Sequence, residues 1–301
     1  MSRISKNNVI RHSFGTNFAT VMIYAFIMLF ALVCVVPFIL VVIVSFSSEK
    51  SISLIGYSFK PMGWSTGAYK LLLNAASGVP KAYLITISVT VIGTVLASLI
   101  TFGAGYALAN RNCRYRNGLS LYFYITMVFS AGLVPWYMVS KKLGMYDNIW
   151  ALIVPSMIFS PFNMFLVRNF VAGIPEELDD AAKIDGAGDI TTAFRVYFPL
   201  CKPVMATIAL FYAIGYWNNY FNAVMLINDP DFYNLQMLLF KIQSQVSALS
   251  KLSFTISATS NPPKESFKMA MSVVTMGPIV LLYPFLQKYF VKGMVVGAVK
   301  G

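Results

Sequence analysis

Polar side chains that could do chemistry gather in two places in this chain of 301 residues. In one of them, tyrosine and asparagine side chains recur at helical spacing between Tyr212 and Asn222. Aromatic rings and amides are the side chains that sugars engage, by stacking and by hydrogen bonding to hydroxyl groups. The other group comes earlier in the chain. It holds six of the eleven acidic residues within fourteen consecutive positions: Glu176, Glu177, Asp179, Asp180, Asp185 and Asp189.

Catalytic motifs are absent or incomplete. No Gly-Lys pair occurs anywhere in the sequence, so the phosphate-binding loop of ATPases is missing. The stretch Gly63–Gly67 matches the G-x-S-x-G of a nucleophile elbow, but the one histidine, His12, lies across the predicted membrane, and a plain turn is favoured. That histidine and the scattered Cys34, Cys113 and Cys201 are too few for a metal cluster or a disulfide framework. We therefore expect no catalytic residue, no metal site and no cofactor in this chain.

Composition places the chain in a membrane. Only 11% of the residues are charged, against about 25% in soluble proteins, and 57% are hydrophobic, with a mean hydropathy of +0.68. So few charges cannot cover a water-facing surface, which excludes a soluble enzyme. The net charge of +12 comes from Lys and Arg residues that flank apolar stretches. Membrane lipids with anionic headgroups account for that charge, and we expect no nucleic-acid partner.

Six apolar segments are long enough to cross a membrane. A membrane-spanning helix needs about 20 residues, and a backbone in lipid must satisfy its own hydrogen bonds, which favours helices over open sheets. We therefore predict an all-α polytopic membrane protein with six transmembrane helices, preceded by an N-terminal arm of residues 1–17. The predicted spans are residues 18–46, 82–109, 119–140, 148–170, 199–227 and 269–291.

The basic residues predict the orientation of these spans. All seven arginines fall in the N-terminal arm, near the second connection or near the fourth. The positive-inside rule therefore predicts cytoplasmic N- and C-termini and a cytoplasmic fourth connection, residues 171–198. Ten lysines from Lys50 to Lys268 would lie outside, against 13 basic residues inside. The outer lysines would suit an acidic oligosaccharide, an acidic face on a docking protein, or lipid headgroups.

The fourth connection predicts two helices joined by a bend. The proline and glutamates at residues 175–177 suit the first turn of a helix, Ala181 and Ala182 propagate it, and Gly186 can end it in a left-handed conformation. Asp189 can then cap a second helix that leads to the fifth span. The physics alone leaves a solvated amphipathic loop as an alternative to a functional segment.

A polar stripe follows the predicted fifth span. Polar groups at this depth should face protein or a cavity rather than lipid. The stripe is therefore either a path for the solute or a packing seam in which asparagines bond between helices. Its members are Tyr212, Gly215, Tyr216, Asn219 and Asn222, with Trp217 and Asn218 beside them.

The segment Glu177-Leu-Asp-Asp-Ala-Ala-Lys-Ile-Asp-Gly-Ala187 resembles the EAA loop of binding-protein-dependent ABC importer permeases. The glutamate that the family places before the alanine pair is Asp180 here, which keeps the charge and shortens the reach. The resemblance covers nearly the whole chain and is greatest to the carbohydrate branch, in its LplC and alginate-oligosaccharide type. The other stretches that carry it are residues 132–135, 162–163, 198–200, 217–218, 285–293 and 297–301.

The resemblance implies a type I ABC importer transmembrane domain over residues 18–301, in a bacterial cytoplasmic membrane. Such a permease pairs with a homologous second permease, docks on two cytoplasmic ABC ATPase subunits through a coupling helix, and receives an oligosaccharide from an extracytoplasmic sugar-binding protein. The implied ATPase-coupling residues are Glu176, Glu177, Asp180, Ala181, Ala182, Asp185 and Gly186. The candidate substrate path consists of Tyr212, Tyr216, Trp217, Asn218, Asn219 and Asn222.

Two other functions stay open on the residues alone. A secondary transporter would show paired ionisable groups, or broken helices in two repeated halves, and neither is evident in the sequence. A structural membrane subunit without an ATPase partner is opposed only by the EAA-like segment. A membrane enzyme would need a cluster of catalytic side chains within a span, and the sequence has none.

Overall fold

The computed structural model describes residues 14–74, 77–155, 157–252 and 265–280. Within these residues the regular structure is helical, and the one isolated β-bridge joins Ser47 to Trp64. The chain forms two compact units, of which the first consists of Met1–Tyr69 with Pro262–Val273. The second consists of Lys70–Asn261 with Val274–Gly301.

In the first unit, helix α1 (Phe14–Ser45) confirms a helix at the first predicted span. A short helix, α2 (Glu49–Ile55), follows, and its N-cap Ser48 accepts a hydrogen bond from the Ser51 backbone N–H. The Glu49 carboxylate accepts hydrogen bonds from the backbone N–H groups of Glu265 and Ser266, at 3.0 and 3.2 Å. These bonds join the region after the first span to the segment that precedes the sixth predicted span.

The G-x-S-x-G match in this unit is a turn. The Ser65 Oγ accepts a hydrogen bond from the Gly67 backbone N–H at 3.1 Å, and the Ser65 N–H donates to the Phe46 carbonyl at 2.7 Å. Nearby, burial and a 2.6 Å hydrogen bond to Glu265 raise the pKa of Tyr57 to about 12. Nothing in this arrangement aligns Ser65 with a general base among the described residues.

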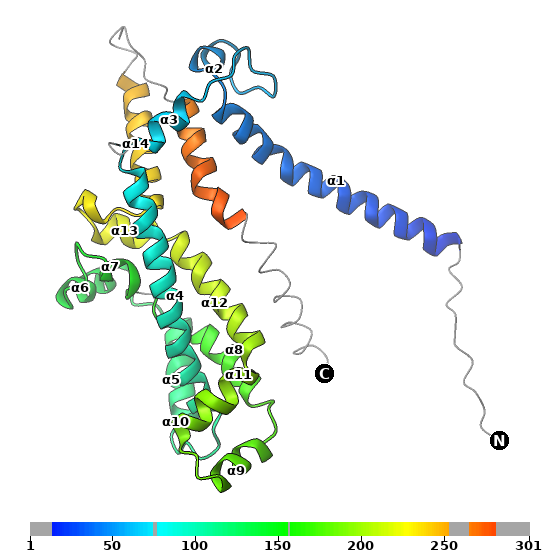
Figure 1. Ribbon diagram of the computed structural model, residues 1–301, viewed down its shortest axis with the longest axis vertical. Helices are drawn as coiled ribbons and strands as arrows, with labels where there is room; N and C mark the ends of the chain where they lie inside the picture. Colours follow the sequence, from blue (N-terminus) through cyan, green and yellow to red (C-terminus); the bar gives the residue numbers. More distant parts are fainter. Residues whose placement is uncertain (1–13, 75–76, 156, 253–264, 281–301) are drawn as a thin grey trace. The chain divides into compact units, whose positions relative to one another are not determined.

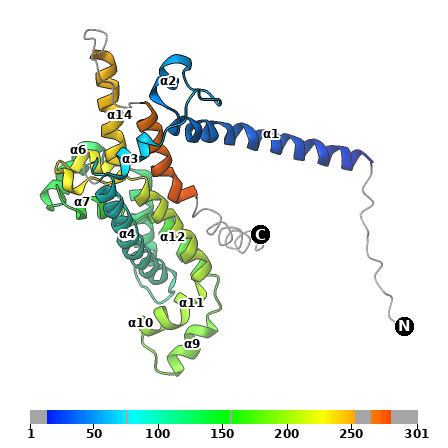
Figure 2. The same ribbon diagram turned by 45° about the horizontal axis from the view of Figure 1, so that its top comes forward.

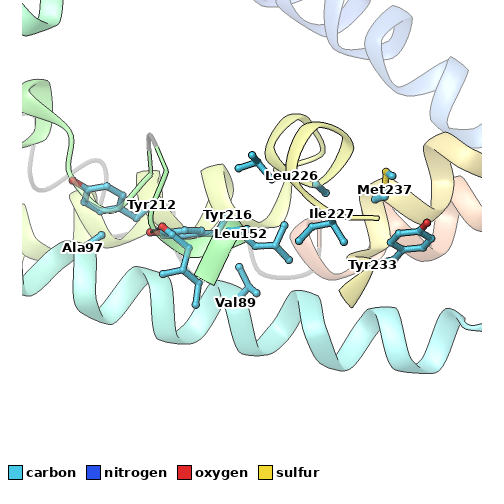
Figure 3. Packing of buried hydrophobic residues seen from close by; sticks show 12 residues of the cluster. Val89, Ala97, Leu152, Tyr212, Tyr216, Leu226, Ile227, Tyr233 and Met237 are labelled. Atoms are coloured by element: carbon cyan, nitrogen blue, oxygen red, sulfur yellow. Dashed lines mark hydrogen bonds between the residues drawn. The ribbon is translucent and has the colours of Figure 1, made fainter. Parts of the chain in front are cut away.

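The second unit is built along one long helix, α4 (Val79–Ala109), which confirms a helix at the second predicted span. Helices α8 (Pro161–Val171) and α12 (Lys202–Trp217) pack against it (Figure 1). The buried α4 side chains recur every three or four residues, at Ala82, Thr86 and Val89 and onward, because one face of the helix meets these neighbours. A cluster of buried apolar side chains lies along this face, where Val89 and Ala97 of α4 meet Leu152, Tyr212 and Tyr216 (Figure 3).

The third predicted span is wrong as a single helix. Helix α5 (Arg116–Val128) and helix α6 (Leu133–Lys142) are bent by 116° at a break between them. Gly132 takes a φ of 85° at this break, and Pro135 lies in the first turn of α6. Helix α5 has ended at Val128, and Gly132 is the N-cap from which α6 begins in a new direction, at a φ that favours glycine.

The fourth and fifth predicted spans are also broken. In the fourth, a four-residue helix, α7 (Trp150–Ile153), is followed by irregular backbone at residues 154–155 and 157–160 before α8 begins. Pro155 lies near the start of this irregular stretch, and Pro161 follows its end. Proline has no backbone N–H to donate to a helical hydrogen bond, so Pro155 favours a break in the helix. In the fifth, α12 ends at Trp217 and a short helix, α13 (Phe221–Leu226), follows.

Three more helices and one 3₁₀ turn lie in the described residues outside the fourth connection. These are α3 (Gly67–Leu73), the 3₁₀ turn η3 (Pro230–Phe232), α14 (Leu235–Leu252) and a helix over residues 265–280. The last of these covers the first part of the sixth predicted span, and the remainder of that span lies outside the described residues. Within the described residues, two helices are long and apolar enough to cross a membrane, and two bent pairs bring this to four if each is one span.

Candidate functional site

The fourth connection contains the predicted helix, glycine bend and second helix. Helix α9 (Glu177–Ile184) has Asp185 as its C-cap, and the next residue, Gly186, has a φ of 77°. The Gly186 N–H donates to the Lys183 carbonyl at 3.0 Å, and the Ala187 N–H donates to the Ala182 carbonyl at 2.9 Å. These two bonds form a Schellman motif, which needs a residue with positive φ at the position of Gly186. The predicted left-handed conformation is therefore confirmed.

The second helix differs from the prediction in two respects. Asp189 does not cap it, because α10 (Asp189–Thr191) begins at Asp189 and its N-cap is Gly188, which offers no side chain. The helix then continues as a π-helical turn, η2 (Thr192–Tyr197), and ends in α11 (Phe198–Leu200). The chain turns by 85° before α12, so Pro199 lies in the last turn before the bend rather than opening the fifth span.

We call the fourth connection, residues 171–198, the candidate coupling segment, and most of it is exposed. Ala182 is the one predicted coupling residue that is buried, whereas Glu176, Glu177, Asp180, Ala181, Asp185 and Gly186 are exposed. Apolar side chains share this exposed surface: Leu178 is 38% exposed and Ile184 is 87% exposed. Together with Ala181 they follow a spacing of three residues along one face of α9. The sequence reasoning missed Leu178 and Ile184, although apolar residues at helical spacing within an acidic segment were a usable signal.

An apolar cluster holds the C-terminal part of the candidate coupling segment. Tyr197 packs edge-on against Tyr106 of α4 at 5.2 Å between ring centroids, and Phe198 packs edge-on against Phe102 at 5.0 Å. Buried side chains from α4, α8, η2 and α12 complete this cluster. Both views show α9 and α10 together at one end of the second unit (Figures 1 and 2). The segment is thus attached to the ends of the long helices through packed aromatic rings.

Two ion pairs lie on the same segment. Arg111 Nε is 2.5 Å from Glu176 Oε1, and Lys183 Nζ is 2.6 Å from Asp179 Oδ2. The hydrogen bond from Lys183 to Asp179 raises the pKa of the lysine. Because Arg111, Glu176 and Lys183 are exposed, water and salt screen both pairs, and the pairs add little to stability. The pair of Arg111 and Glu176 joins the residues after α4 to the start of α9, whereas the pair of Lys183 and Asp179 lies within α9.

The predicted stripe is a buried seam between α12, the start of α13 and the broken fourth segment. We call Tyr212, Tyr216, Asn219 and Asn222 the polar seam. The Tyr216 hydroxyl donates to the Ile153 carbonyl at 3.0 Å, Asn219 Nδ2 to the Leu152 carbonyl at 3.2 Å, and Asn222 Nδ2 to the Pro155 carbonyl at 2.7 Å. These acceptors belong to the residues where the fourth helix ends, so the seam satisfies carbonyls that the break leaves without helical partners.

Tyr212 links the seam to two other elements. Its hydroxyl is 2.6 Å from the Thr101 hydroxyl of α4, and it accepts a hydrogen bond from the Ser160 backbone N–H at 3.0 Å. Figure 3 shows Tyr212 and Tyr216 above α4, with Leu152 beside Tyr216. All four seam side chains are at least 94% buried within this one chain.

The two neighbours of the seam differ from each other. Trp217 is buried, and its indole N–H donates to the Thr275 carbonyl at 3.0 Å. Asn218 is exposed, and its side chain contacts the Ile214 carbonyl at 3.0 Å and the Gln236 amide at 3.3 Å. Of the six predicted path residues, Asn218 is therefore the one with an exposed side chain.

An open cavity of about 390 Å³ lies beside the seam, between α8 and α12. Among the seam residues, Tyr212 reaches it. Asn163 contributes a side-chain amide, and the rings of Phe162 and Phe211 contribute aromatic surface. The lining carries no charged side chain, so it suits hydroxyl groups and the flat faces of sugar rings. The full lining is Met157, Ser160, Phe162, Asn163, Phe211, Tyr212 and Gly215.

Known proteins share this sequence and architecture over nearly their full lengths. The chain is 38% identical over 280 residues to the polygalacturonan/rhamnogalacturonan transport system permease protein YtcP of Bacillus subtilis, covering 93% of this chain and 97% of YtcP. It is 39% identical over 272 residues to protein LplC of the same organism, covering 89% and 90%. A solved structure of a bacterial ABC transporter involved in the import of the acidic polysaccharide alginate matches with a TM-score of 0.80 and 31% identity, covering 92% of this chain and 98% of that one.

The same similarity appears at the level of a protein family. The sequence pattern of the binding-protein-dependent transport system inner membrane component family matches residues 9–296. This match confirms the resemblance that rested on the EAA-like segment, and the solved relative confirms the all-helical fold of an ABC importer permease. The chain therefore belongs to the family of binding-protein-dependent transport system inner membrane components.

Proposed function

We propose that this chain is one of two permease subunits of an ATP-driven importer, which carries an oligosaccharide across the bacterial cytoplasmic membrane. The observation that carries the proposal is the near full-length similarity to carbohydrate permeases. A homologous second permease, two cytoplasmic ABC ATPase subunits and an extracytoplasmic sugar-binding protein complete the importer. The names of the relatives favour an oligosaccharide cut from a polysaccharide, and acidic polymers are the first to test.

In this proposal, α9 is the coupling helix. Its exposed face presents Leu178, Ala181 and Ile184 to a groove on an ATPase subunit, with Asp180 and Asp185 beside them. The opposite side is held through Ala182 and through the aromatic contacts of Tyr197. A short helix held in this way transmits a displacement that a flexible loop would absorb. ATP-driven closure of the ATPase pair would thus move the ends of α4, α8 and α12.

We place six membrane crossings in this chain, with both termini in the cytoplasm. The broken fourth segment supports a crossing because buried side chains of the polar seam satisfy its freed carbonyl groups. Broken helices of this kind line cavities in membrane transporters. They also occur in secondary transporters, and the full-length family match is what favours an ATP-driven importer.

We also propose that the sugar path follows the cavity between α8 and α12 rather than the polar seam itself. The hydrogen-bonding groups of Tyr216, Asn219 and Asn222 are bound to protein carbonyls, whereas the Asn163 amide and the Phe162 ring line open space. Asn218, exposed at the end of α12, remains a candidate contact for the solute. The buried Trp217 fixes the end of α12 through its hydrogen bond to the Thr275 carbonyl. In this proposal Trp217 and the polar seam hold α12 in position and do not contact the sugar.

The first prediction concerns the source of energy. The purified chain should hydrolyse no ATP, because its sequence has no phosphate-binding loop. Oligosaccharide uptake by proteoliposomes should require this chain, the second permease, the ATPase and the binding protein together. The measurement is uptake and ATP hydrolysis with each component omitted in turn. Uptake driven by an ion gradient without the ATPase would instead identify a secondary transporter.

The second prediction separates the path from the seam. Asn163→Ala should lower oligosaccharide uptake while membrane abundance stays normal, because it removes an amide that faces the cavity. Asn222→Ala should lower abundance and thermal stability, because the Pro155 carbonyl loses its donor, at a cost of about 1–3 kcal/mol. Asn218→Ala is the matched exposed control for stability. Normal uptake in the Asn163 variant would show that the solute does not pass through this cavity.

A further inference from the structure

A second cavity, of about 390 Å³, lies where the ends of α4 and α8 meet the start of α9. We call it the arginine cavity, because Arg111, Arg116 and Arg168 line it. Since α4 is long and apolar enough to span a membrane and ends at Ala109, this cavity lies at the membrane surface. The proposed function leaves it unused, and the sugar path is a separate cavity.

Some basic side chains of this cavity form no ion pair with an acidic side chain among the described residues. Arg111 is paired with Glu176, and Lys183 is paired with Asp179. Among the described residues, neither Arg116 nor Arg168 forms an ion pair, although both are half-buried. The guanidinium of Arg168 lies 6.0 Å from the centre of the Phe165 ring. Two half-buried guanidinium groups therefore have donors free for an anion.

A buried hydroxyl group belongs to one of the residues that line this cavity. Tyr106 is 9% exposed and lines the cavity, and its hydroxyl has no hydrogen-bond partner among the described residues. A buried polar atom without a partner destabilises a protein by about 1–3 kcal/mol unless a ligand or a water satisfies it. The rings of Phe102 and Tyr197 hold Tyr106 in place, so its hydroxyl is a fixed donor.

We propose that the arginine cavity binds a phosphate group, as presented by the headgroup of an anionic phospholipid. Guanidinium groups bind phosphate oxygens with paired hydrogen bonds, and basic pockets between membrane helices bind anionic headgroups. Three acidic side chains line the cavity: Glu176 at the N-cap of α9, and Asp179 and Asp180 within α9. Glu176 and Asp179 are already neutralised by ion pairs. Because α9 forms one wall, an occupied cavity fixes the coupling segment against the end of α4.

The test uses the full chain in nanodiscs and follows its melting temperature, which rises when a ligand binds the folded state. One arm raises the share of phosphatidylglycerol in phosphatidylcholine discs, and the other titrates inorganic phosphate into pure phosphatidylcholine discs. We expect a saturable rise for the unaltered chain. Combining Arg116→Gln with Arg168→Gln should weaken binding about tenfold or more for each arginine removed. Arg114→Gln should leave binding unchanged, because this exposed arginine does not line the cavity.

Tyr106→Phe provides an independent variant if the double arginine variant fails to fold. It keeps the ring contacts, removes only the hydroxyl, and should weaken binding about two- to tenfold. A rise with phosphatidylglycerol alone identifies a lipid as the source, and a rise with inorganic phosphate identifies a soluble one; both support a phosphate site. The proposal is overturned if the unaltered chain shows no saturable rise in either arm, or if the variants respond as it does. Neither result depends on the ATPase, so the proposed transport function is tested separately.

Discussion

Gly186→Thr should abolish oligosaccharide transport while the protein still reaches the membrane. Gly186 has a φ of 77° in the Schellman motif that ends α9, and a β-branched residue at such a φ is strained by about 1–3 kcal/mol. Relieving that strain changes the angle between α9 and α10. A typical coupling energy between two sites is also about 1–3 kcal/mol, so this strain is enough to disturb the contact with an ATPase. It is small beside the burial of long apolar helices in lipid.

Gly188→Thr is the matched control for this change. No atom lies within 4 Å of a Cβ added at Gly186 or at Gly188, so neither substitution causes a steric clash. Gly188 has a φ of −74° at the N-cap of α10, where threonine is tolerated as well as glycine. Membrane abundance, ATPase co-purification and uptake should be near normal for Gly188→Thr, and Gly186→Asn should be intermediate, because asparagine adopts positive φ more readily. Equal uptake by the two threonine variants would contradict a hinge at Gly186.

Local features of the coupling segment were predictable because they depend on neighbours in the sequence. The end of α9 at Gly186 follows from a glycine placed after a helix-forming stretch. The anchoring of that segment was not predictable. The contacts of Tyr197 with Tyr106 and of Glu176 with Arg111 join residues far apart in the chain, and no local pattern indicates such pairs.

The breaks in the third, fourth and fifth spans show the limit of hydropathy. Each break is short beside a window of spanning length, so the mean hydropathy of such a window cannot detect it. Pro155 and Pro161 were local signals of the break in the fourth span. The compensation for that break lies more than sixty residues away, in the hydrogen bonds from Tyr216, Asn219 and Asn222.

That compensation also changes the meaning of the polar stripe. The helical spacing of its tyrosines and asparagines correctly indicated one buried face. Spacing could not distinguish a face that binds a solute from one that binds carbonyls of the same chain. The Phe162-Asn163 pair, which the sequence offered only as part of the family resemblance, lines the open cavity beside this face.

Gly105→Leu should destabilise the chain strongly, whereas Gly103→Leu should not. Both glycines lie inside α4, and leucine improves helix propensity and apolarity equally at the two positions. A Cβ at Gly105 would lie 2.7 Å from Val167 Cγ1 and 3.1 Å from the Met164 carbonyl oxygen, whereas a Cβ at Gly103 would meet nothing within 4 Å. Of these two glycines, Gly105 alone permits a close approach of helices within the described residues.

The energetic consequence follows from what surrounds Gly105. Val167 and Met164 are fully buried in α8, so neither can move aside without separating α8 from α4. Overpacking costs about 1–3 kcal/mol for small insertions, and a whole leucine side chain exceeds that range. Separation would also open the cluster of Phe102 and Tyr197 that holds the coupling segment. The measurement is the melting temperature of each purified variant alone in detergent, with Gly105→Ala as the smaller step. A Gly105→Leu variant as stable as Gly103→Leu would mean that α4 and α8 do not pack closely at this point.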